Sequence, residues 1–405
     1  MRIVHICDKD CLGGAEIACL RHCEAMLASG WDASMMVVEK RSDKTFVKLL
    51  IHGIELSWHR VFCHLHNIIA RKINATGLFS VMRFGHDISR LDDIYQADVI
   101  FLHWVNGNTL SLRDVKRVLQ LGKPTFWFMH DMFPITGGCH YSMGCEGYRT
   151  TCSSCPLIGN TTYKWIAQKQ LKQKISRWSK YQNLSFVTPS HWLAGLVSAS
   201  KVAAGRKVFV VPNLIDTQVY KPLPFTCKTV FGLDLHKKTL LFGAASMKSV
   251  YKGTQILHSF LKMLDPEKYE GLIIGEKCED IVKDVNITVK SIGFLSDDYS
   301  RVMAYNACDT VVITSVAENY PNMVLEAMAC GKPCVGFNTG GIPELINHGE
   351  TGFITPDKTA EELARWVDKL FSDKTRYLEM SAMARKQIEE VNSYKRVRQV
   401  YRELL

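Results

Sequence analysis

The chain has 405 residues, of which 47% are hydrophobic and 22% charged, with a formal net charge of +10. This length exceeds what one hydrophobic core usually serves, so it favours two domains. The composition is typical of a globular protein, and the sequence has no run of eighteen uncharged apolar residues, which argues against a transmembrane helix.

The placement of charge and cysteine indicates the environment of the protein. Residues 1–190 hold 23 Lys and Arg against 15 Asp and Glu, whereas residues 191–405 hold 27 against 25. A basic first half suits an anionic partner, although a solvated lysine-rich surface would have the same composition. The start, Met1–Ile6, is typical of a first β-strand and not of a signal peptide. We therefore expect a cytoplasmic protein whose 14 cysteines are buried thiols or metal ligands.

Apolar, β-branched segments alternate with segments of helical periodicity along the chain. The predicted strands are 2–7, 33–38, 99–103, 125–130, 185–189, 208–211, 240–244, 271–275, 310–314 and 334–337. The predicted helices include 15–29, 111–121, 253–263, 299–308, 324–330 and a long last one within 374–405. Such alternation indicates parallel sheets with right-handed crossovers, in an α/β fold.

The pattern starts afresh near residue 238, which predicts two doubly wound, Rossmann-like domains at 1–190 and 226–385. Pro189, Pro212, Pro222 and Pro224 suggest a linker at 191–225, and we expect residues 386–405 to pack back toward the first domain. Because such sheets bind ligands at the carboxyl ends of their strands, we expect the chemistry in a cleft between two facing domains.

The strongest chemical signal is the segment Ser315–Gly331, which follows a predicted strand and opens a helix. Glu318 would lie on the loop, and Glu326 about one turn into the helix. Backbone N–H groups at the helix start, from Asn322, Met323 and Val324, can hold a pyrophosphate, and carboxylates can bind sugar hydroxyls. Two unrelated glutamates on a surface helix would have the same spacing.

The Glu-x7-Glu spacing of Glu318 and Glu326 resembles that of retaining glycosyltransferase family 4. Five flanking motifs occur in the order typical of that family: Gly293–Leu295, Tyr305–Asp309, Cys330–Val335, Gly340–Leu345 and Gly349–Phe353. The resemblance implies the GT-B architecture and a UDP- or GDP-sugar donor. It also implies that Glu318 contacts the donor sugar and that Glu326 binds the ribose.

The same resemblance suggests further residues of the donor site. Lys252 resembles the lysine that grips the donor diphosphate, where negative charge must be neutralised. The alternative is an exposed lysine at a helix start. The family usually has an arginine six residues earlier, where this chain has Ser246, and Lys248 could substitute for it.

Residues of the first half also match the family pattern. The Gly13-Gly14 turn resembles the loop that faces the donor phosphates, and His130 resembles the cleft histidine that positions the reacting sugar. His103 is a weaker candidate for the acceptor site. Asp8 and Asp10 have the letters of an Asp-x-Asp metal motif, but they precede the glycine turn. We therefore expect no catalytic metal ion.

A cysteine-rich insertion, residues 137–156, contains four cysteines within seventeen residues: Cys139, Cys145, Cys152 and Cys155. They could form a closed, structural zinc site, and the alternative is four buried or loop thiols. Residues 90–160 also resemble a subgroup of family 4 that builds colanic acid and related polysaccharides.

Residues 56–72 read as a basic amphipathic helix, with Trp58 and Phe62 among its apolar residues and Arg71 and Lys72 at its end. Such a helix can lie on a membrane surface. The alternative is a helix that packs on the first domain.

Together these observations predict a hexosyltransferase peripheral to the inner face of the cell membrane. The acceptor would be a hydroxyl of a growing, polyprenyl-diphosphate-linked bacterial surface glycan, such as O-antigen, capsule or exopolysaccharide. A nucleotide-sugar epimerase or hydrolase of the same fold is the alternative. We expect no nucleic-acid partner, because the basic residues do not read as gathered into an aromatic-interleaved patch.

Overall fold

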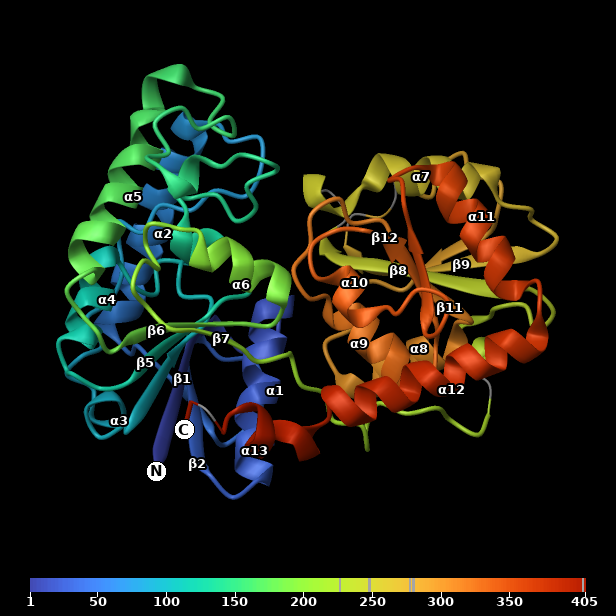
Figure 1. Ribbon diagram of the computed structural model, residues 1–405, viewed down its shortest axis with the longest axis horizontal. Helices are drawn as coiled ribbons and strands as arrows, with labels where there is room; N and C mark the ends of the chain where they lie inside the picture. Colours follow the sequence, from blue (N-terminus) through green and yellow to red (C-terminus); the bar gives the residue numbers. More distant parts are fainter. Residues whose placement is uncertain (226, 247–248, 277, 279–280, 403) are drawn as a thin grey trace. The chain divides into compact units, whose positions relative to one another are not determined.

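The computed structural model describes residues 1–225, 227–246, 249–276, 278, 281–402 and 404–405, and it divides into two compact units (Figure 1). The first unit comprises Met1–Pro212 and Val397–Leu405, and the second comprises Asn213–Arg396. No helix in these ranges combines the length and the apolar character needed to cross a bilayer.

The first unit is built on a seven-stranded parallel sheet with the order β3-β2-β1-β4-β5-β6-β7. Its strands are β1 (Arg2–Lys9), β2 (Asp32–Glu39), β3 (Val47–Leu49), β4 (Val99–Leu102), β5 (Thr125–Phe128), β6 (Leu184–Thr188) and β7 (Val208–Val210). Its helices are α1 (Gly14–Ala28), α2 (Ile54–Ile73), α3 (Asp92–Tyr95), α4 (Leu112–Leu119), α5 (Trp165–Trp178), α6 (His191–Ser198) and α13 (Val397–Val400), with short 3-10 turns η1 (Phe133–Ile135), η2 (Gly147–Arg149) and η3 (Thr161–Tyr163).

The second unit has a six-stranded parallel sheet with the order β10-β9-β8-β11-β12-β13. Its strands are β8 (Lys238–Ser246), β9 (Tyr269–Glu276), β10 (Val289–Ser291), β11 (Thr310–Ile313), β12 (Cys334–Phe337) and β13 (Gly352–Thr355). Its helices are α7 (Thr254–Met263), α8 (Asp298–Ala307), α9 (Asn322–Ala329), α10 (Ile342–Leu345), α11 (Ala360–Phe371) and α12 (Lys374–Val391), with 3-10 turns η4 (Lys228–Phe231), η5 (Val250–Lys252) and η6 (Tyr394–Arg396).

The central strands are apolar because helices cover both faces of a parallel sheet. All residues of β4, β5, β11 and β12 are buried. Local signals set the helix starts: the Ser111 hydroxyl accepts from the Asp114 N–H, and the Asp114 carboxylate accepts from the Ser111 N–H, a capping box that begins α4.

The prediction of two doubly wound α/β domains is confirmed, with differences at the boundaries. Residues 191–210, predicted as linker, contribute α6 and β7 to the first unit, and the chain passes to the second unit after Pro212. The long last helix is interrupted: α12 ends at Val391, and the first unit resumes at Val397. The edge strands β3, β10 and β13 were not predicted, since three or four residues carry little periodic signal.

Strand order fixes where each unit can bind a ligand. In the first sheet the order reverses between β1 and β4, and in the second it reverses between β8 and β11. Loops that leave the carboxyl ends of such neighbours diverge to opposite faces and leave room for a ligand. The candidate residues follow β1, β4 and β5 in the first unit, and β8 and β11 in the second.

Candidate functional site

Lys252 and Glu318 form an ion pair at the switch point of the second sheet. The Lys252 Nζ lies 2.6 Å from the Glu318 Oε2, and the Glu318 side chain is 11% exposed. Gly253 permits this approach, because its φ is +63° and a Cβ there would lie 2.0 Å from the Thr314 carbonyl oxygen. The Thr314 hydroxyl also donates to the Lys252 carbonyl, at 2.7 Å. The turn after β8 is therefore fixed against the end of β11.

The Glu318 carboxylate is held from two further sides. The Asn319 N–H donates to Oε1 at 3.2 Å, and the Ser315 hydroxyl donates to Oε2 at 3.4 Å. Gly340, with a φ of +58°, presses its backbone against Glu318: a Cβ at this glycine would lie 1.6 Å from the Glu318 carbonyl oxygen. The glycine pair of the 340–345 motif therefore serves to bring a second loop onto Glu318.

The start of α9 has the predicted position but a different set of donors. The Val324 N–H donates to the Pro321 carbonyl at 3.1 Å, so it is used within the turn. Asn213 fixes this turn by donating to the Asn322 Oδ1 and to the Tyr320 carbonyl. Met323 lies near β8, where its Cε would be 3.2 Å from a Cβ at Gly243. The Val324 N–H is therefore not available to an anion at the helix start.

Glu326 is buried and held by two residues of α8. The Tyr305 hydroxyl donates to the Glu326 Oε2 at 2.6 Å, and the Arg301 Nη1 lies 3.9 Å from Oε1. Burial and the neighbouring Glu326 carboxylate raise the pKa of Tyr305 well above its usual value, so the phenol remains a donor. Sequence reasoning missed both partners, although their spacing of four residues on a predicted helix was the available signal.

Two further donor-site positions were named from the sequence, Ser246 and Lys248. The backbone of Ser246 ends β8, but its side chain lies outside what the structure describes. Lys248 lies outside the described residues altogether.

In the first unit, Gly13 precedes α1 at the end of β1, and Glu16 folds back onto it. A Cβ at Gly13 would lie 2.4 Å from the Glu16 Oε2, so a larger residue there would displace this carboxylate. Burial, with the nearby Asp8 charge, raises the pKa of Glu16 to about 7. Burial likewise raises the pKa of Asp8 to about 6, against the hydrogen bond from Thr109.

Asp8 and Asp10 do not act as a pair. Asp8 accepts from the Thr109 hydroxyl at 2.9 Å, whereas Asp10 accepts from the N–H groups of Arg41 and Ser42. The second aspartate is thus used in holding the chain after β2.

His130 is the last member of a chain of three imidazoles. Its Nε2 lies 2.9 Å from the His103 Nδ1, and the His103 Nε2 lies 2.9 Å from the His5 Nδ1. The His5 Nε2 lies 3.3 Å from the Met26 sulfur, which can only accept. Burial lowers the pKa of His130 to about 4 and that of His5 to about 3, so the rings are neutral at pH 7. His130 is therefore suited to hydrogen bonding and not to carrying a positive charge.

Asp131, the neighbour of His130, accepts hydrogen bonds from three residues. Its partners are His140 Nδ1 at 2.6 Å, the Trp104 indole at 3.1 Å and the Phe133 N–H at 2.8 Å. Burial alone would raise the pKa of Asp131, but His140 and these hydrogen bonds hold it below its usual value. This network ties the end of β5 to the cysteine-rich insertion.

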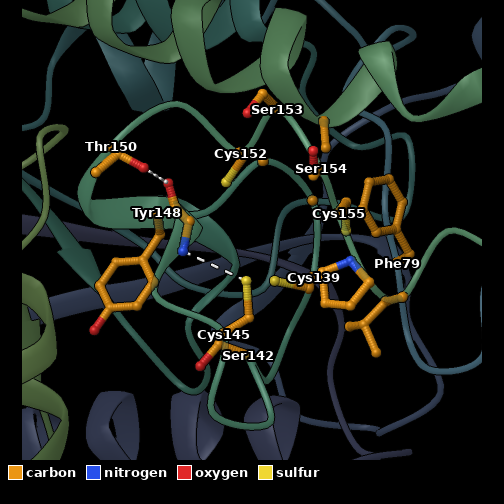
Figure 2. A pocket seen from close by; sticks show the side chains of 16 residues that line it. Phe79, Cys139, Ser142, Cys145, Tyr148, Thr150, Cys152, Ser153, Ser154 and Cys155 are labelled. Carbon is orange, nitrogen blue, oxygen red and sulfur yellow. Dashed lines mark hydrogen bonds between the residues drawn. The ribbon is translucent and has the colours of Figure 1, made fainter.

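The four cysteines of the insertion line one cavity of about 160 Å³, as Figure 2 shows. All four are free thiols. Elsewhere among the described residues, the side chains of His5, Cys19 and His103 place three ligand atoms within 4.8 Å of one another. The nitrogens of His5 and His103 are, however, already used in the imidazole chain.

The helix expected at 56–72 is α2, and it has two apolar stripes. One stripe, formed by Phe62, His66, Ile69 and Ile73, is partly or fully buried against the unit. The other, formed by Ile54, Trp58, Val61, Leu65 and Ile68, is exposed by 38–75% at a helical spacing of three and four. The packing alternative is therefore confirmed for one face of the helix, and the membrane role of the other face stays a prediction.

Beside α2 lies a basic groove of about 650 Å³, which the sequence did not reveal. Its cations come from α2, from the segment after it, and from α4 and α5: Lys72, Arg83, Arg113, Lys169 and Arg177. Tyr163, Trp165 and Phe84 also line it, and no carboxylate does. Within the structure's described ranges, none of the five cations has a carboxylate within 4 Å. Burial and the charge of Arg113 lower the pKa of Arg177.

A family model, Glycosyl transferases group 1, matches residues 234–387 of the chain. Over 249 residues the chain is 28% identical to N-acetyl-alpha-D-glucosaminyl L-malate synthase of Bacillus anthracis. This match covers 60% of each protein. It is 23% identical over 274 residues to the putative colanic acid biosynthesis glycosyl transferase WcaC of Escherichia coli, covering 61% of this chain and 62% of the relative. The matches thus span about three fifths of these relatives' length.

Solved structures match over the whole chain. Anabaena Alr3699/HepE, in complex with UDP and glucose, superposes with a TM-score of 0.67 at 19% identity and covers 100% of this chain and 98% of its own. Sucrose-phosphate synthase from Thermosynechococcus elongatus gives the same TM-score at 14% identity, with 100% and 99% covered. At these identities the likeness shows the fold, and it confirms the GT-B class.

Proposed function

We propose that this chain, whose residues 234–387 match the glycosyl transferases group 1 model, transfers a hexosyl group from a nucleotide sugar to a hydroxyl of a growing glycan. The observation that carries the proposal is the Lys252–Glu318 pair at the β8/β11 switch point, with Glu326 anchored in the helix that follows. A cation, a hydroxyl-binding carboxylate and a helix start lie within one unit, as a sugar diphosphate requires.

The ion pair suggests how the donor would be recognised. The donor diphosphate competes with Glu318 for Lys252, and the released Glu318 accepts hydrogen bonds from the sugar hydroxyls. Asn322 and Met323 at the start of α9 hold the phosphate oxygens, and Glu326 holds the ribose. Tyr305 and Arg301 hold the Glu326 carboxylate in position for this role.

We further propose that the anomeric configuration is retained. In a front-face reaction the acceptor oxygen forms the new bond to the anomeric carbon while the bond to the leaving phosphate breaks, and the acceptor proton passes to that phosphate. Catalysis then rests on positioning and on charge stabilisation. His130, a neutral imidazole, contributes a hydrogen bond to the sugar and no charge.

The acceptor side is proposed to work at an anionic membrane surface, with a polyprenyl-diphosphate-linked saccharide as acceptor. The exposed stripe of α2 has Trp58 and four aliphatic residues that can enter the headgroup region. The adjacent groove adds five cations and no carboxylate, which complements lipid phosphates. We infer a peripheral location at the cytoplasmic face of the membrane.

Nucleotide binding and turnover, measured on the full chain, test the donor assignment. UDP is the first nucleotide to try, since Anabaena Alr3699/HepE holds UDP and UDP-glucose, and GDP is the second. Lys252→Gln keeps a hydrogen bond to Glu318 but loses the charge, so the dissociation constant measured by calorimetry should rise by about tenfold or more, as expected for a charged hydrogen bond. His130→Asn should preserve nucleotide affinity and lower turnover.

The control is Lys262→Gln, an exposed lysine in the last turn of α7. The opposite pattern, with affinity lost in His130→Asn and kept in Lys252→Gln, would contradict the assignment. Epimerisation or hydrolysis of the donor at an undiminished rate without any acceptor would favour the alternative activity.

A further inference from the structure

We propose that Cys139, Cys145, Cys152 and Cys155 bind one zinc ion, as a structural site with four thiolate ligands. The sequence left open whether these cysteines bind metal or are separate thiols. The fold brings all four to one cavity, although Cys139 follows η1 and Cys155 lies sixteen residues later, beyond η2 (Figure 2).

The cavity selects a soft metal ion. Its other lining residues are apolar, glycine or hydroxyl-bearing side chains, and within the described ranges neither a carboxylate nor an imidazole lines it. Magnesium and calcium prefer oxygen ligands, whereas thiolates select zinc or iron. A cavity of about 160 Å³ also leaves room for an ion between the sulfur atoms.

His140 is excluded as a fourth ligand, although it is adjacent to Cys139. Its Nδ1 lies 2.6 Å from the Asp131 Oδ2, and its Nε2 lies 2.8 Å from the Ser80 Oγ. Both nitrogens are therefore occupied on the side of the Asp131 network. This excludes a site of three cysteines and one histidine and leaves four sulfur ligands.

The backbone of the insertion holds two of the cysteines at the cavity. The Gly147 N–H donates to the Cys145 Sγ at 3.4 Å. Cys152 adopts a φ of +52°, uncommon for a residue other than glycine, at the turn that carries its side chain to the cavity.

A buried cation faces the same segment. Lys174 of α5 has no exposed surface, and its ammonium donates to the carbonyl oxygens of Phe133 and Thr136. In the part of the chain that the structure describes, no carboxylate lies within 4 Å of this ammonium. Four thiolates around Zn²⁺ carry a net charge of −2, which would compensate the cation. The Thr136 hydroxyl also donates to the Cys139 carbonyl, so the lysine and the first cysteine belong to one turn.

Regular structure is sparse in the insertion. Between Gly137 and Asn160 it is the single turn η2. Tyr148 packs in the main core of the unit, and Cys155 and Ile158 form a smaller cluster with Ile73 and Ala167. The edges are attached to the end of α2: the Gly159 N–H donates to the Asn74 carbonyl, and the Thr76 N–H to the Leu157 carbonyl. A zinc ion would therefore fix the insertion against α2.

No three of the four sulfur atoms lie within 4.8 Å of one another, so they do not form a tetrahedron in this structure. With zinc–sulfur bonds of about 2.3 Å, metal binding would draw them together. Zinc binding would therefore contract the cavity.

Metal content and coordination of the full chain, purified under reducing conditions, test the site. Elemental analysis should give one zinc per chain, and X-ray absorption should show four sulfur neighbours at about 2.3 Å. A strong chelator should remove the zinc, lower the melting temperature and make the four thiols reactive.

Variants locate the ion. Cys152→Ser with Cys155→Ser should lose the zinc, whereas the matched control, Cys63→Ser with Cys227→Ser, replaces one partly exposed and one buried thiol elsewhere and should keep it. His140→Gln should also keep one zinc. If the cysteine variant does not fold, the coordination measured on the unaltered chain decides. Any of four results would overturn the proposal. The purified chain could contain no metal, or one iron in place of zinc. The Cys152/Cys155 variant could retain its zinc, or X-ray absorption could show a nitrogen atom bound to the zinc.

Discussion

At the scale of single residues, the donor unit depends on side chains that hold other side chains. Glu326 is oriented by Tyr305 and approached by Arg301, and Glu318 is held by Lys252, Ser315 and the Asn319 N–H. The family resemblance identified the two glutamates, but their partners come from another helix and another loop. Only the fold brings these partners to the carboxylates.

Glu326→Gln should weaken binding of the free nucleotide by about 1–3 kcal/mol, because a charged hydrogen bond to the ribose becomes a neutral one. Tyr305→Phe keeps the carboxylate and loses only its orientation, so its effect should be smaller. Both are measured by calorimetry, with the exposed Glu350→Gln as control. If the affinity of Glu326→Gln for the nucleotide is unchanged, Glu326 does not bind the ribose.

Glu16 provides a prediction on pH. Its pKa in the folded state is about 7, above the value of 4.5 for an exposed glutamate, so the folded state binds this proton more tightly than the unfolded state does. Stability contributed by the protonated form is therefore present at low pH and is lost as pH rises from about 4.5 to about 7. A glutamine at position 16 does not titrate, so it would not make the stability depend on pH in this way.

Between pH 5 and pH 8 the free energy of unfolding of Glu16→Gln, relative to the unaltered chain, should therefore increase by about 2–3 kcal/mol. Urea unfolding of the first unit, followed at both pH values, measures it. The exposed Glu361→Gln of the second unit serves as control. A difference that does not change with pH would show that Glu16 has an ordinary pKa.

At the scale of elements, α2 and its neighbours show what a sequence can and cannot indicate. The amphipathic pattern of 56–72 was visible, but only the fold separates its buried stripe from its exposed one. The basic groove could not be predicted from the sequence, because its cations lie on four segments between Lys72 and Arg177 that are far apart along the chain. The expectation that basic residues do not gather beside aromatic ones was wrong for this reason.

Vesicle binding tests this surface. The chain should bind vesicles with anionic lipid more tightly than neutral ones, and less tightly in high salt. Lys169→Gln with Arg177→Gln should reduce the preference for anionic vesicles by about 1 kcal/mol per charge. Trp58→Ala with Leu65→Ala should weaken binding to both kinds, because an apolar contact is lost.

The matched controls lie on α12 of the second unit: Lys374→Gln and Leu378→Ala, whose side chains are exposed. Equal binding by all variants would mean that neither the exposed stripe nor the groove contacts the membrane. Tighter, groove-dependent binding of single-stranded nucleic acid than of anionic vesicles would assign the groove to a different partner.

At the scale of the whole molecule, the sequence indicated the number of units, the parallel sheets and most of the central strands, because buried parallel strands leave long apolar segments. The linker was placed too early, since α6 and β7 are short and lie among prolines. The return of the chain to the first unit is secured by contacts with α1 and its C-cap: the Tyr401 hydroxyl lies 2.9 Å from the His22 Nδ1, and Arg398 donates to the Ser29 carbonyl. Such pairings, hundreds of residues apart, have no local signal.

Sugar transfer to a lipid tests the central claim most directly. The full chain is incubated with UDP-sugars or GDP-sugars labelled in the sugar and with membranes that contain polyprenyl-diphosphate-linked saccharides. The account predicts that label enters the lipid-extractable fraction in step with nucleotide release, that the product keeps the anomeric configuration of the donor, and that Lys252→Gln and Glu326→Gln abolish or strongly reduce transfer. Nucleotide release that is equal with and without the acceptor, with all label remaining water-soluble, would contradict it.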